Sequence, residues 1–519
     1  MSRRRILWAD DQIEELRSHI LFLEGKGFEV VGASNGDDAL DLMRNQAFDA
    51  VLLDEMMPGR GGLETLEGIR DLGASMPVIM ITKSEEEQLM DRALGRRISD
   101  YLVKPVNPTQ ILMALKRALD TTRITEEQVT QQYLQSFGRA AMERTEARTF
   151  EEWARIFDRM VDWDLELNRL KDPELAQMHV DQMRDANAEF CRFVERNYAD
   201  WIAGGDDAPT MSHQLLERYV EPHLRQGKRV VLFVIDCMRL DQWKAIEHVL
   251  DPYYSIQPEL YCGIVPTATP FARNAIFSGL LPREIAKRHP QWWRGSAQEE
   301  RSKNAFEKEL LQEQLKRRGL GDVRSHYFRT FDIADTEQLR KKVPTLKNAG
   351  LIAAVVNFLD ILAHGRSHND LLQELAPDQA AFRSVMRSWF EHSALLDLLR
   401  DIAAWDDTVV VITTDHGAVQ VRKAAVVKAN RDASTNVRYK YGDNLNLGHR
   451  DDAIDVRDPE SYGLPRDSPI QNYVLARDYN FFVYPTNQNE YARQYTDSFQ
   501  HGGVSLEEMI VPVVTLRTR

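Results

Sequence analysis

Carboxylate and imidazole side chains follow apolar segments at several points in the second half of this 519-residue chain. Each one alone is more often an ordinary polar residue at the end of an element. Together they are three aspartates and three histidines: Asp236, Asp360, His364, Asp415, His416 and His501. Oxygen and imidazole ligands without thiolate suit Zn²⁺ or Mn²⁺ better than a structural cysteine-type site. With one hydroxyl added, such a set is about what two adjacent divalent ions need.

The segment 264–279 offers that hydroxyl, because it contains Pro266-Thr267-Ala268-Thr269 followed by small residues. This composition suits a strand-to-helix turn with a threonine at the helix N-terminus, where the threonine could also be a simple N-cap. A threonine oxygen on a metal loses its proton more readily and becomes a nucleophile. Two metals roughly 3.5–4 Å apart clamp a phosphoryl group. The pattern therefore predicts metal-assisted hydrolysis of a phosphate ester.

The first 120 residues carry a second set of such side chains. Asp10, Asp11 and Asp54 follow apolar runs, and three converging carboxylates repel one another unless a hard cation such as Mg²⁺ lies between them. Thr82 and Lys104 follow two further runs. A hydroxyl and a lysine in these positions would bind the oxygens of a phosphoryl group carried on a carboxylate. Five such residues at the ends of strands are a much stronger signal than any one of them.

The elements that must position these residues are alternating strands and helices. Short apolar runs lie at residues 6–9, 28–33, 50–53, 78–81 and 101–103, and helical patterns at about 37–44, 63–71, 85–94 and 108–119. This alternation predicts a doubly wound parallel sheet with its site at the carboxyl ends of the strands. Residues 121–204 predict two or three antiparallel helices with an apolar core. Further buried strands at 229–235, 408–414 and 509–516 predict another α/β domain over 205–519.

Composition narrows the class of protein further. The hydrophobic content of 43% and charged content of 28% are those of a soluble globular protein. A net charge of -14 argues against a general nucleic-acid-coating protein, although a local basic groove stays possible. The three cysteines are scattered and predict no disulfide framework. No apolar signal region or membrane-spanning segment is evident, so we expect a cytoplasmic protein.

The N-terminal motifs WADD, LLDEMMPGRGG, MITKS and YLVKPVN resemble the receiver domain of two-component response regulators over residues 1–120. The resemblance implies that Asp54 accepts a phosphoryl group from a cognate sensor histidine kinase. It also implies one Mg²⁺, with Asp11 as a direct ligand and Asp10 and Asp54 beside it. Thr82 and Lys104 would contact the phosphoryl group, and Tyr101 would be the aromatic switch residue.

The C-terminal motifs VIDCMRLDQW, VPTATPFARNAIFSGLLP, DILAH, TTDHG and HGGVSLEEMIVP resemble the alkaline phosphatase superfamily, most closely its PglZ branch. The resemblance implies two Zn²⁺. Their ligands would be Asp360, His364 and His501 for one ion, and Asp236, Asp415, His416 and the nucleophile Thr269 for the other. Thr269 is preferred to Thr267 because its spacing to Gly279 matches the phosphodiesterase-like relatives. Arg273 and Asn274 could touch a substrate phosphate, or be surface polar residues.

Residues 422–466 are polar, charged and poor in apolar periodicity. This segment looks like a lid or a substrate-shaping insertion. Arg422, Lys423, Lys428, Arg438 and Lys440 give it a basic bias that would favour an anionic substrate, and solvated loop charges are the alternative.

The whole chain is thus predicted to be a multidomain α/β protein. A (βα)₅ receiver (1–120), a helical bundle connector (121–204) and an alkaline-phosphatase-like α/β domain (205–519) follow one another. This order resembles response regulators of Bacteroidota-type bacteria that are linked to type IX secretion. The resemblance implies a zinc phosphodiesterase acting on linear or cyclic oligonucleotides, and a homodimer when phosphorylated. No direct DNA-binding module is evident. The alternative is a non-catalytic scaffold whose PglZ domain binds partner regulators.

Overall fold

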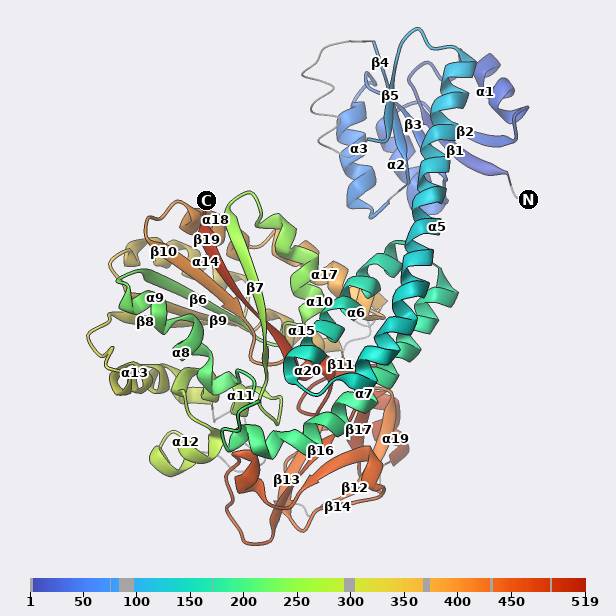
Figure 1. The fold of residues 1–519 in the computed structure, drawn as a ribbon. Coiled ribbons are helices and arrows are strands. Elements are labelled where there is room, and N and C mark those ends of the chain that lie inside the picture. Colours follow the sequence, from blue (N-terminus) through green and yellow to red (C-terminus); the bar gives the residue numbers. More distant parts are fainter. Residues whose placement is uncertain are drawn as a thin grey trace. The chain divides into compact units, whose positions relative to one another are not determined.

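The computed structural model describes residues 3–74, 76–83, 98–170, 172–293, 304–366, 374–429, 433–485 and 488–519. The chain divides into two compact units, Met1–Gly138 and Arg139–Arg519, and Figure 1 shows the elements of each. Among the described residues, no helix is both long and apolar enough to cross a membrane.

The first unit is built on a five-stranded parallel sheet of order β2-β1-β3-β4-β5. The strands are β1 (Arg4–Ala9), β2 (Phe28–Ala33), β3 (Ala50–Asp54), β4 (Val78–Thr82) and β5 (Asp100–Val103). Helices α1 (Arg17–Glu24), α2 (Gly36–Asn45), α3 (Gly62–Asp71) and the start of α5 accompany them. Alternate residues of β1 pack into two different cores, so both faces of the sheet are covered. The predicted doubly wound fold is confirmed, while the helix predicted at 85–94 lies outside the described residues.

Helix α5 (Pro108–Glu146) is much longer than the sequence pattern indicated. We expected a helix ending near residue 119, but the helix continues across the predicted boundary at 120 and across the division between the two units. The physical reason is the absence of a stop signal, since no proline or glycine occurs between Thr109 and Phe137. The single Gly138 is tolerated inside the helix.

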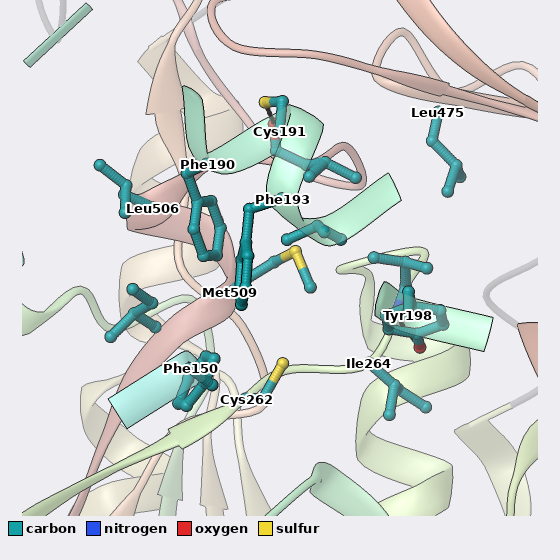
Figure 2. Close-up of a cluster of buried hydrophobic side chains, with 14 of the residues drawn as sticks. Phe150, Phe190, Cys191, Phe193, Tyr198, Cys262, Ile264, Leu475, Leu506 and Met509 are labelled. Atoms are coloured by element: carbon teal, nitrogen blue, oxygen red, sulfur yellow. Dashed lines mark hydrogen bonds between the residues drawn. The ribbon is translucent and has the colours of Figure 1, made fainter. Parts of the chain in front are cut away.

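Helices α6 (Phe150–Leu170) and α7 (Pro173–Ile202) follow, and Asp172 caps α7 by accepting hydrogen bonds from Glu174 and Leu175. The apolar core predicted for these helices is present, but the C-terminal segment shares it. Phe150, Trp153, Phe190 and Phe193 belong to one buried cluster with residues of the C-terminal segment. Figure 2 shows Phe190 and Phe193 beside Leu506 and Met509. The bundle helices and the C-terminal domain therefore pack as one body within the second unit.

The C-terminal domain is organised around a six-stranded sheet of order β7-β19-β10-β6-β9-β8. Its strands are β6 (Arg229–Ile235), β7 (Tyr254–Cys262), β8 (Ser325–Thr330), β9 (Leu351–Val356), β10 (Thr408–Thr413) and β19 (Ile510–Thr518). Strands β10, β6, β9 and β8 are mutually parallel, and β19 runs antiparallel to β10 and β7. The carboxyl ends of four neighbouring strands therefore meet at one edge.

Helices cover both faces of this sheet, because the β6 side chains that point to one face and those that point to the other are all apolar. Val231, Phe233 and Ile235 share a core with α10 (Leu240–Ile246), α14 (Ile333–Lys342), α17 (Gln379–Glu391) and α18 (Ala394–Ala403). Val230, Leu232 and Val234 share another with α8 (Leu215–Tyr219), α9 (Glu221–Arg225), α11 (Thr269–Ser278), α12 (Pro282–Arg288) and α13 (Glu307–Arg317). The remaining short elements are α15 (Phe358–Arg366), α19 (Gln488–Tyr495), α20 (Leu506–Met509), β11 (Val419–Gln420) and β18 (Phe499–Gln500).

The described residues of the segment 422–466 form strands, which corrects the expectation of a solvated loop; its role as a lid or a substrate-shaping insertion stays a prediction. It supplies β12 (Lys423–Lys428), β13 (Tyr439–Asp443), β14 (Asn446–Leu447) and β15 (Ala453–Val456), which pair with β16 (Gln471–Ala476) and β17 (Asn480–Val483) in two small sheets. A core of its own includes Val427 and Leu445. Arg438 and Lys440 are buried, so they are neither solvated loop charges nor free for an anion. The sheets went unpredicted because their strands are short and carry buried polar residues.

Candidate active site and metal centres

One cluster of ligand-type residues lies between α15 and the C-terminal segment. Asp360 and His364 stand one turn apart on α15, and His501 follows β18. One ligand atom from each lies within 4.8 Å of the others. His364 Nε2 is 3.3 Å and His501 Nε2 is 3.4 Å from Asp360 Oδ1. The two Nε2 atoms are 3.1 Å apart, a spacing that suits two nitrogens directed at a common cation.

A second cluster is formed by Asp236, Asp415 and His416, all of them buried. Strands β6 and β10 pair with Val234 opposite Thr413, so the residues that follow the two strands come together at the sheet edge. His416 Nε2 is 3.6 Å from Asp236 Oδ1 and 3.8 Å from Asp415 Oδ2. The rings of His416 and His501 stack with centroids 4.1 Å apart, so the two clusters adjoin.

Backbone carbonyls orient both buried imidazoles. His416 Nδ1 is 3.0 Å from the Gly417 carbonyl and His501 Nδ1 is 3.2 Å from the Thr267 carbonyl. Each Nδ1–H can therefore donate to a carbonyl and leave the Nε2 lone pair directed into the site, as metal-binding histidines require. Gly417 is needed for close packing, because a Cβ there would lie 1.9 Å from the Glu507 carbonyl oxygen.

Thr269 is the first residue of α11, and its hydroxyl faces the second cluster. Its Oγ1 lies 3.1 Å from His416 Nε2 and 3.5 Å from Asp236 Oδ1. Thr267 Oγ1, in contrast, donates to the Gly503 carbonyl and accepts from Gly502 N–H. Thr267 is fully buried, so its hydroxyl is engaged in holding the loop that carries His501.

The electrostatics of the two clusters fit bound cations. Burial, and then the neighbouring Asp236 carboxylate, raise the pKa of Asp415 well above its usual range. Among the described residues, no donor lies within hydrogen-bonding distance of the buried Asp415 Oδ2. Burial lowers the pKa of His416 well below its usual range, so its imidazole is neutral. A buried carboxylate oxygen without a donor and a neutral imidazole are what a divalent ion would ligate.

Arg273 lies behind the second cluster and does not face an open site. Its guanidinium donates to Asp236 Oδ2 at 2.6 Å, Glu307 Oε1 at 2.5 Å and Asn357 Oδ1 at 3.0 Å. Asn274 is also buried, and its amide donates to the Pro270 carbonyl. These contacts do not support a role in touching substrate phosphate, and burial excludes the alternative of surface polar residues. Arg273 instead positions the Asp236 carboxylate.

Sequence reasoning missed the residues that hold the loop 501–508. Glu508 accepts hydrogen bonds from Gly503 N–H at 2.9 Å and from the Ser505 hydroxyl at 2.7 Å, and it pairs with the buried Arg438. The Ser505-x-x-Glu508 spacing is a capping-box pattern that could have been read from the sequence. Arg438 and Glu307 gave no such signal, because nothing in sequence spacing shows which distant charges will be buried together.

The first unit brings together the three carboxylates that were predicted to bind Mg²⁺. Ligand oxygens of Asp10, Asp11 and Asp54 lie within 4.8 Å of one another. Lys104 Nζ lies 2.9 Å from both Asp10 Oδ2 and Asp54 Oδ1. Burial raises the pKa of Asp54, the Lys104 contact opposes this, and Asp10 raises it further. A cation among the three carboxylates would offset that repulsion, and their oxygen-only donor set suits Mg²⁺.

Thr82 and Tyr101 lie near the same strand ends in different surroundings. Thr82 is buried, and its hydroxyl donates to Glu55, a contact that the sequence did not suggest. Tyr101 is 38% exposed, so its ring lies outward. For Thr82 to contact a phosphoryl group on Asp54, its hydroxyl would have to leave Glu55. For Tyr101 to act as a switch, its ring would have to move inward from this exposed position.

Comparison with known protein families assigns all three parts of the chain. The model of the BREX system PglZ alkaline phosphatase-like domain matches residues 215–516, more than half of the chain. The model of the response regulator receiver domain matches residues 6–116. The protein is thus a response regulator with an alkaline-phosphatase-like output domain, and it belongs to the PglZ family. The model of the PorX response regulator linker domain matches residues 123–202, so the chain is a PorX-type response regulator.

Individual relatives match the N-terminal part. ZraR of Klebsiella oxytoca is 35% identical over 133 residues, 26% of this chain and 30% of that protein. CpxR of Escherichia coli K12 is 36% identical over 126 residues, 24% of this chain and 53% of that protein. The chain therefore spans about half or less of these two relatives, both of which are described as transcriptional regulatory proteins.

Solved structures similar to the chain include two receiver-type proteins. Vibrio cholerae CheY4 is 28% identical, with a TM-score of 0.22, and the match covers 22% of this chain and 99% of that one. A CheY-like receiver protein from Methanospirillum hungatei is 32% identical, with a TM-score of 0.23, and the match covers 24% of this chain and 99% of that one.

Proposed function

We propose that the C-terminal domain is a two-metal phosphodiesterase or phosphatase whose activity is regulated by phosphorylation of Asp54. The observation that carries the proposal is the position of Thr269 Oγ1, 3.1 Å from His416 Nε2 in the second ligand cluster, whose His416 stacks on His501 of the first. A site built only to bind metal for stability would not need a partly accessible hydroxyl there. The alternative, a scaffold that binds partner regulators, does not explain that hydroxyl.

The residues would act by covalent catalysis. The Thr269 oxygen would bond to phosphorus, and one ester oxygen would leave as an alcohol, with a proton replacing the one that Thr269 loses. Water would then release phosphate, or for a diester substrate a phosphate monoester, and restore the Thr269 hydroxyl. Asp360, His364 and His501 would hold one ion, and Asp236, Asp415, His416 and Thr269 the other. Bound ions would supply positive charge for the phosphoryl oxygens and lower the pKa of the Thr269 hydroxyl. The N-terminus of α11 adds backbone dipoles directed at the same point.

Zinc is the proposed metal, because mixed carboxylate and imidazole sets without thiolate bind it well in catalytic sites. Linear or cyclic oligonucleotides are the proposed substrates, an assignment that rests on the family resemblance. The receiver domain supports a sensor histidine kinase as the partner that phosphorylates Asp54. Dimerisation on phosphorylation, a cytoplasmic location and a link with type IX secretion are further proposals from the same resemblance.

The proposal is tested with a panel of esters and one pair of variants. Purified wild type, Thr269→Val and Thr269→Ser are compared on bis(p-nitrophenyl) phosphate, p-nitrophenyl phosphate, a linear dinucleotide and a cyclic dinucleotide, with metal content measured on each sample. We expect about two zinc ions per chain in all three proteins. Hydrolysis should fall by at least roughly a thousand-fold in Thr269→Val and persist in Thr269→Ser.

Two results would count against the proposal. If Thr269→Val hydrolysed esters as fast as wild type, Thr269 would not be the nucleophile. If zinc-loaded wild type hydrolysed none of the esters, the scaffold alternative would replace the enzyme.

A further inference from the structure

Phe331 is a large apolar side chain left exposed at the sheet edge that carries the metal clusters. It directly follows β8, the edge strand of the six-stranded sheet, and is 53% exposed. Ile333, two residues later, is 67% exposed. Single exposed apolar residues are common on protein surfaces, but Phe331 and Ile333 are two large apolar side chains exposed within one short segment beside the candidate active site.

Strand register places Phe331 near the site. Ile235 of β6 lies opposite Val356 of β9, and Val356 lies opposite Thr330 of β8. The ladder continues one step further, because Asp236 N–H donates to the Val356 carbonyl and Asn357 N–H to the Thr330 carbonyl. The residue after each strand therefore falls in one row, with Phe331 two strands from Asp236. Two strand spacings are roughly 10 Å, comparable to the reach from a phosphate to the base of its own nucleotide.

A chain of side-chain contacts fixes the ring relative to the site. Arg273 joins Asp236 to Glu307, at 2.6 and 2.5 Å. Glu307 in turn holds Arg329 at 2.5 Å, and the Arg329 guanidinium lies 5.9 Å from the centre of the Phe331 ring. The Phe331 N–H is also bound, since it donates to Asp335 Oδ2 at 3.0 Å. An exposed ring held in this way is preorganised for a contact with something outside the chain.

We propose that Phe331 is the stacking platform for a nucleobase of the substrate, an inference that rests on the phosphodiester hydrolysis proposed above. A base offers a flat apolar face, and every base can stack on an aromatic ring, so one phenylalanine suits substrates of mixed sequence. Arg329 adds positive charge beside the ring. Phe331 is thereby a specificity-determining residue that selects nucleotide esters over simple alkyl esters. A protein segment packing on the ring is the competing occupant, and the experiment separates the two.

The test compares two substrates that share one leaving group, thymidine 5′-(p-nitrophenyl) phosphate and methyl p-nitrophenyl phosphate. The readout is the ratio of their kcat/KM values, in which any loss of folded or metal-loaded protein cancels. We expect wild type to prefer the thymidine ester, and Phe331→Ala to lower that ratio roughly 5- to 100-fold, mainly through KM. Phe331→Trp should keep the ratio. Ile470→Ala is the matched control, because Ile470 is also 53% exposed. It precedes β16, whereas Arg477, which follows β16, pairs with Val504 near the site. This variant should also keep the ratio.

The outcomes distinguish this inference from the proposed function. Hydrolysis of neither ester by wild type would overturn the proposed function, and this inference with it. Hydrolysis with a ratio that Phe331→Ala leaves unchanged would overturn the stacking platform alone, and would favour a protein segment as the occupant of the ring.

Discussion

Thr267 and Thr269 are two residues apart, yet their hydroxyl groups have different partners. The local backbone determines which hydroxyl faces the metal-ligand residues. Thr267 precedes α11 and its hydroxyl bonds to Gly502 and Gly503. Thr269 begins α11 and its hydroxyl faces His416 and Asp236. Cys237, next to Asp236, adopts a left-handed φ of 68°. A residue other than glycine rarely does so, and such strain is concentrated at functional sites.

Asp478 gives a residue-scale prediction about pH. Burial, and then the nearby Glu507, raise the pKa of Asp478 to about 7. The folded protein therefore binds the Asp478 proton more tightly than the unfolded chain does. The contribution of this proton to the free energy of unfolding is lost as pH rises from about 4 through about 7. Asp478→Asn keeps the left-handed backbone that asparagine tolerates. We expect it to increase the free energy of unfolding at pH 8 by roughly 1–3 kcal/mol, with a smaller gain at pH 5.

Urea unfolding at the two pH values measures this effect. Asp407→Asn removes a charge at another left-handed position, which is exposed, and should give only a small change that is similar at both pH values. An equal gain from Asp478→Asn at pH 5 and pH 8 would contradict the raised pKa.

At the scale of elements, helix α7 is tied to the loop that carries His501. The Asn187 side-chain Nδ2 donates to Glu507 Oε2 at 2.8 Å and to the Tyr479 hydroxyl at 2.9 Å, and Asn187 Oδ1 accepts from Leu506 N–H at 2.7 Å. The Cys191 thiol donates to the Val504 carbonyl. Since both residues are buried, a helix of the predicted connector sets the position of a segment of the candidate active site.

Asn187→Ala should therefore lower the free energy of unfolding by about 2–4 kcal/mol, because it leaves buried groups of Leu506 and Glu507 without partners. Asn197→Ala on the same helix removes, among the described residues, a single side-chain bond to the Phe193 carbonyl and should cost less than about 1 kcal/mol. Thermal or urea unfolding compares the two variants. Equal losses would show that the Asn187 contacts do not stabilise the loop.

The sequence was sufficient to predict the strands and helices whose apolar pattern is continuous, and the polar residues at their ends. Strands β1, β6 and β10 are of this kind, and Asp236, Asp415 and His416 follow two of them. It did not reach the small sheets built from 423–483, whose strands are short. It also did not predict that Arg273 and Arg438 are buried. Their burial depends on Glu307 and Glu508, which are distant in sequence, and no local pattern reports such pairs.

At the scale of the whole molecule, both candidate sites lie at the carboxyl ends of parallel strands. Asp54 ends β3 of the receiver, and Asp236 follows β6 of the C-terminal domain. The edge where parallel strands end collects polar loops that the sheet positions rigidly, which is why α/β folds place chemistry there. In the function proposed above, one chain combines a site that accepts a phosphoryl group with a site that hydrolyses phosphate esters.

Asp54→Asn gives the prediction at this scale. Asparagine has no carboxylate to form an acyl phosphate, so the variant should incorporate no label from a radioactive small-molecule phosphodonor, whereas the surface variant Asp41→Asn should be labelled like wild type. Light scattering after labelling should show a dimer for wild type and no change for Asp54→Asn. Label on Asp54→Asn would contradict the assignment of the phosphorylated residue.

If Thr269 is the nucleophile of a metal-dependent phosphoesterase, rapid acid quenching during turnover will trap phosphorus bonded to its oxygen. Zinc-loaded protein is mixed with a ³²P-labelled phosphodiester, quenched, digested and analysed by mass spectrometry. We predict the labelled phosphoryl group, still esterified to the remaining alcohol, on the peptide that contains Thr269, and its absence in Thr269→Val. Efficient turnover with no label on Thr269, or with label on another residue, would contradict the account.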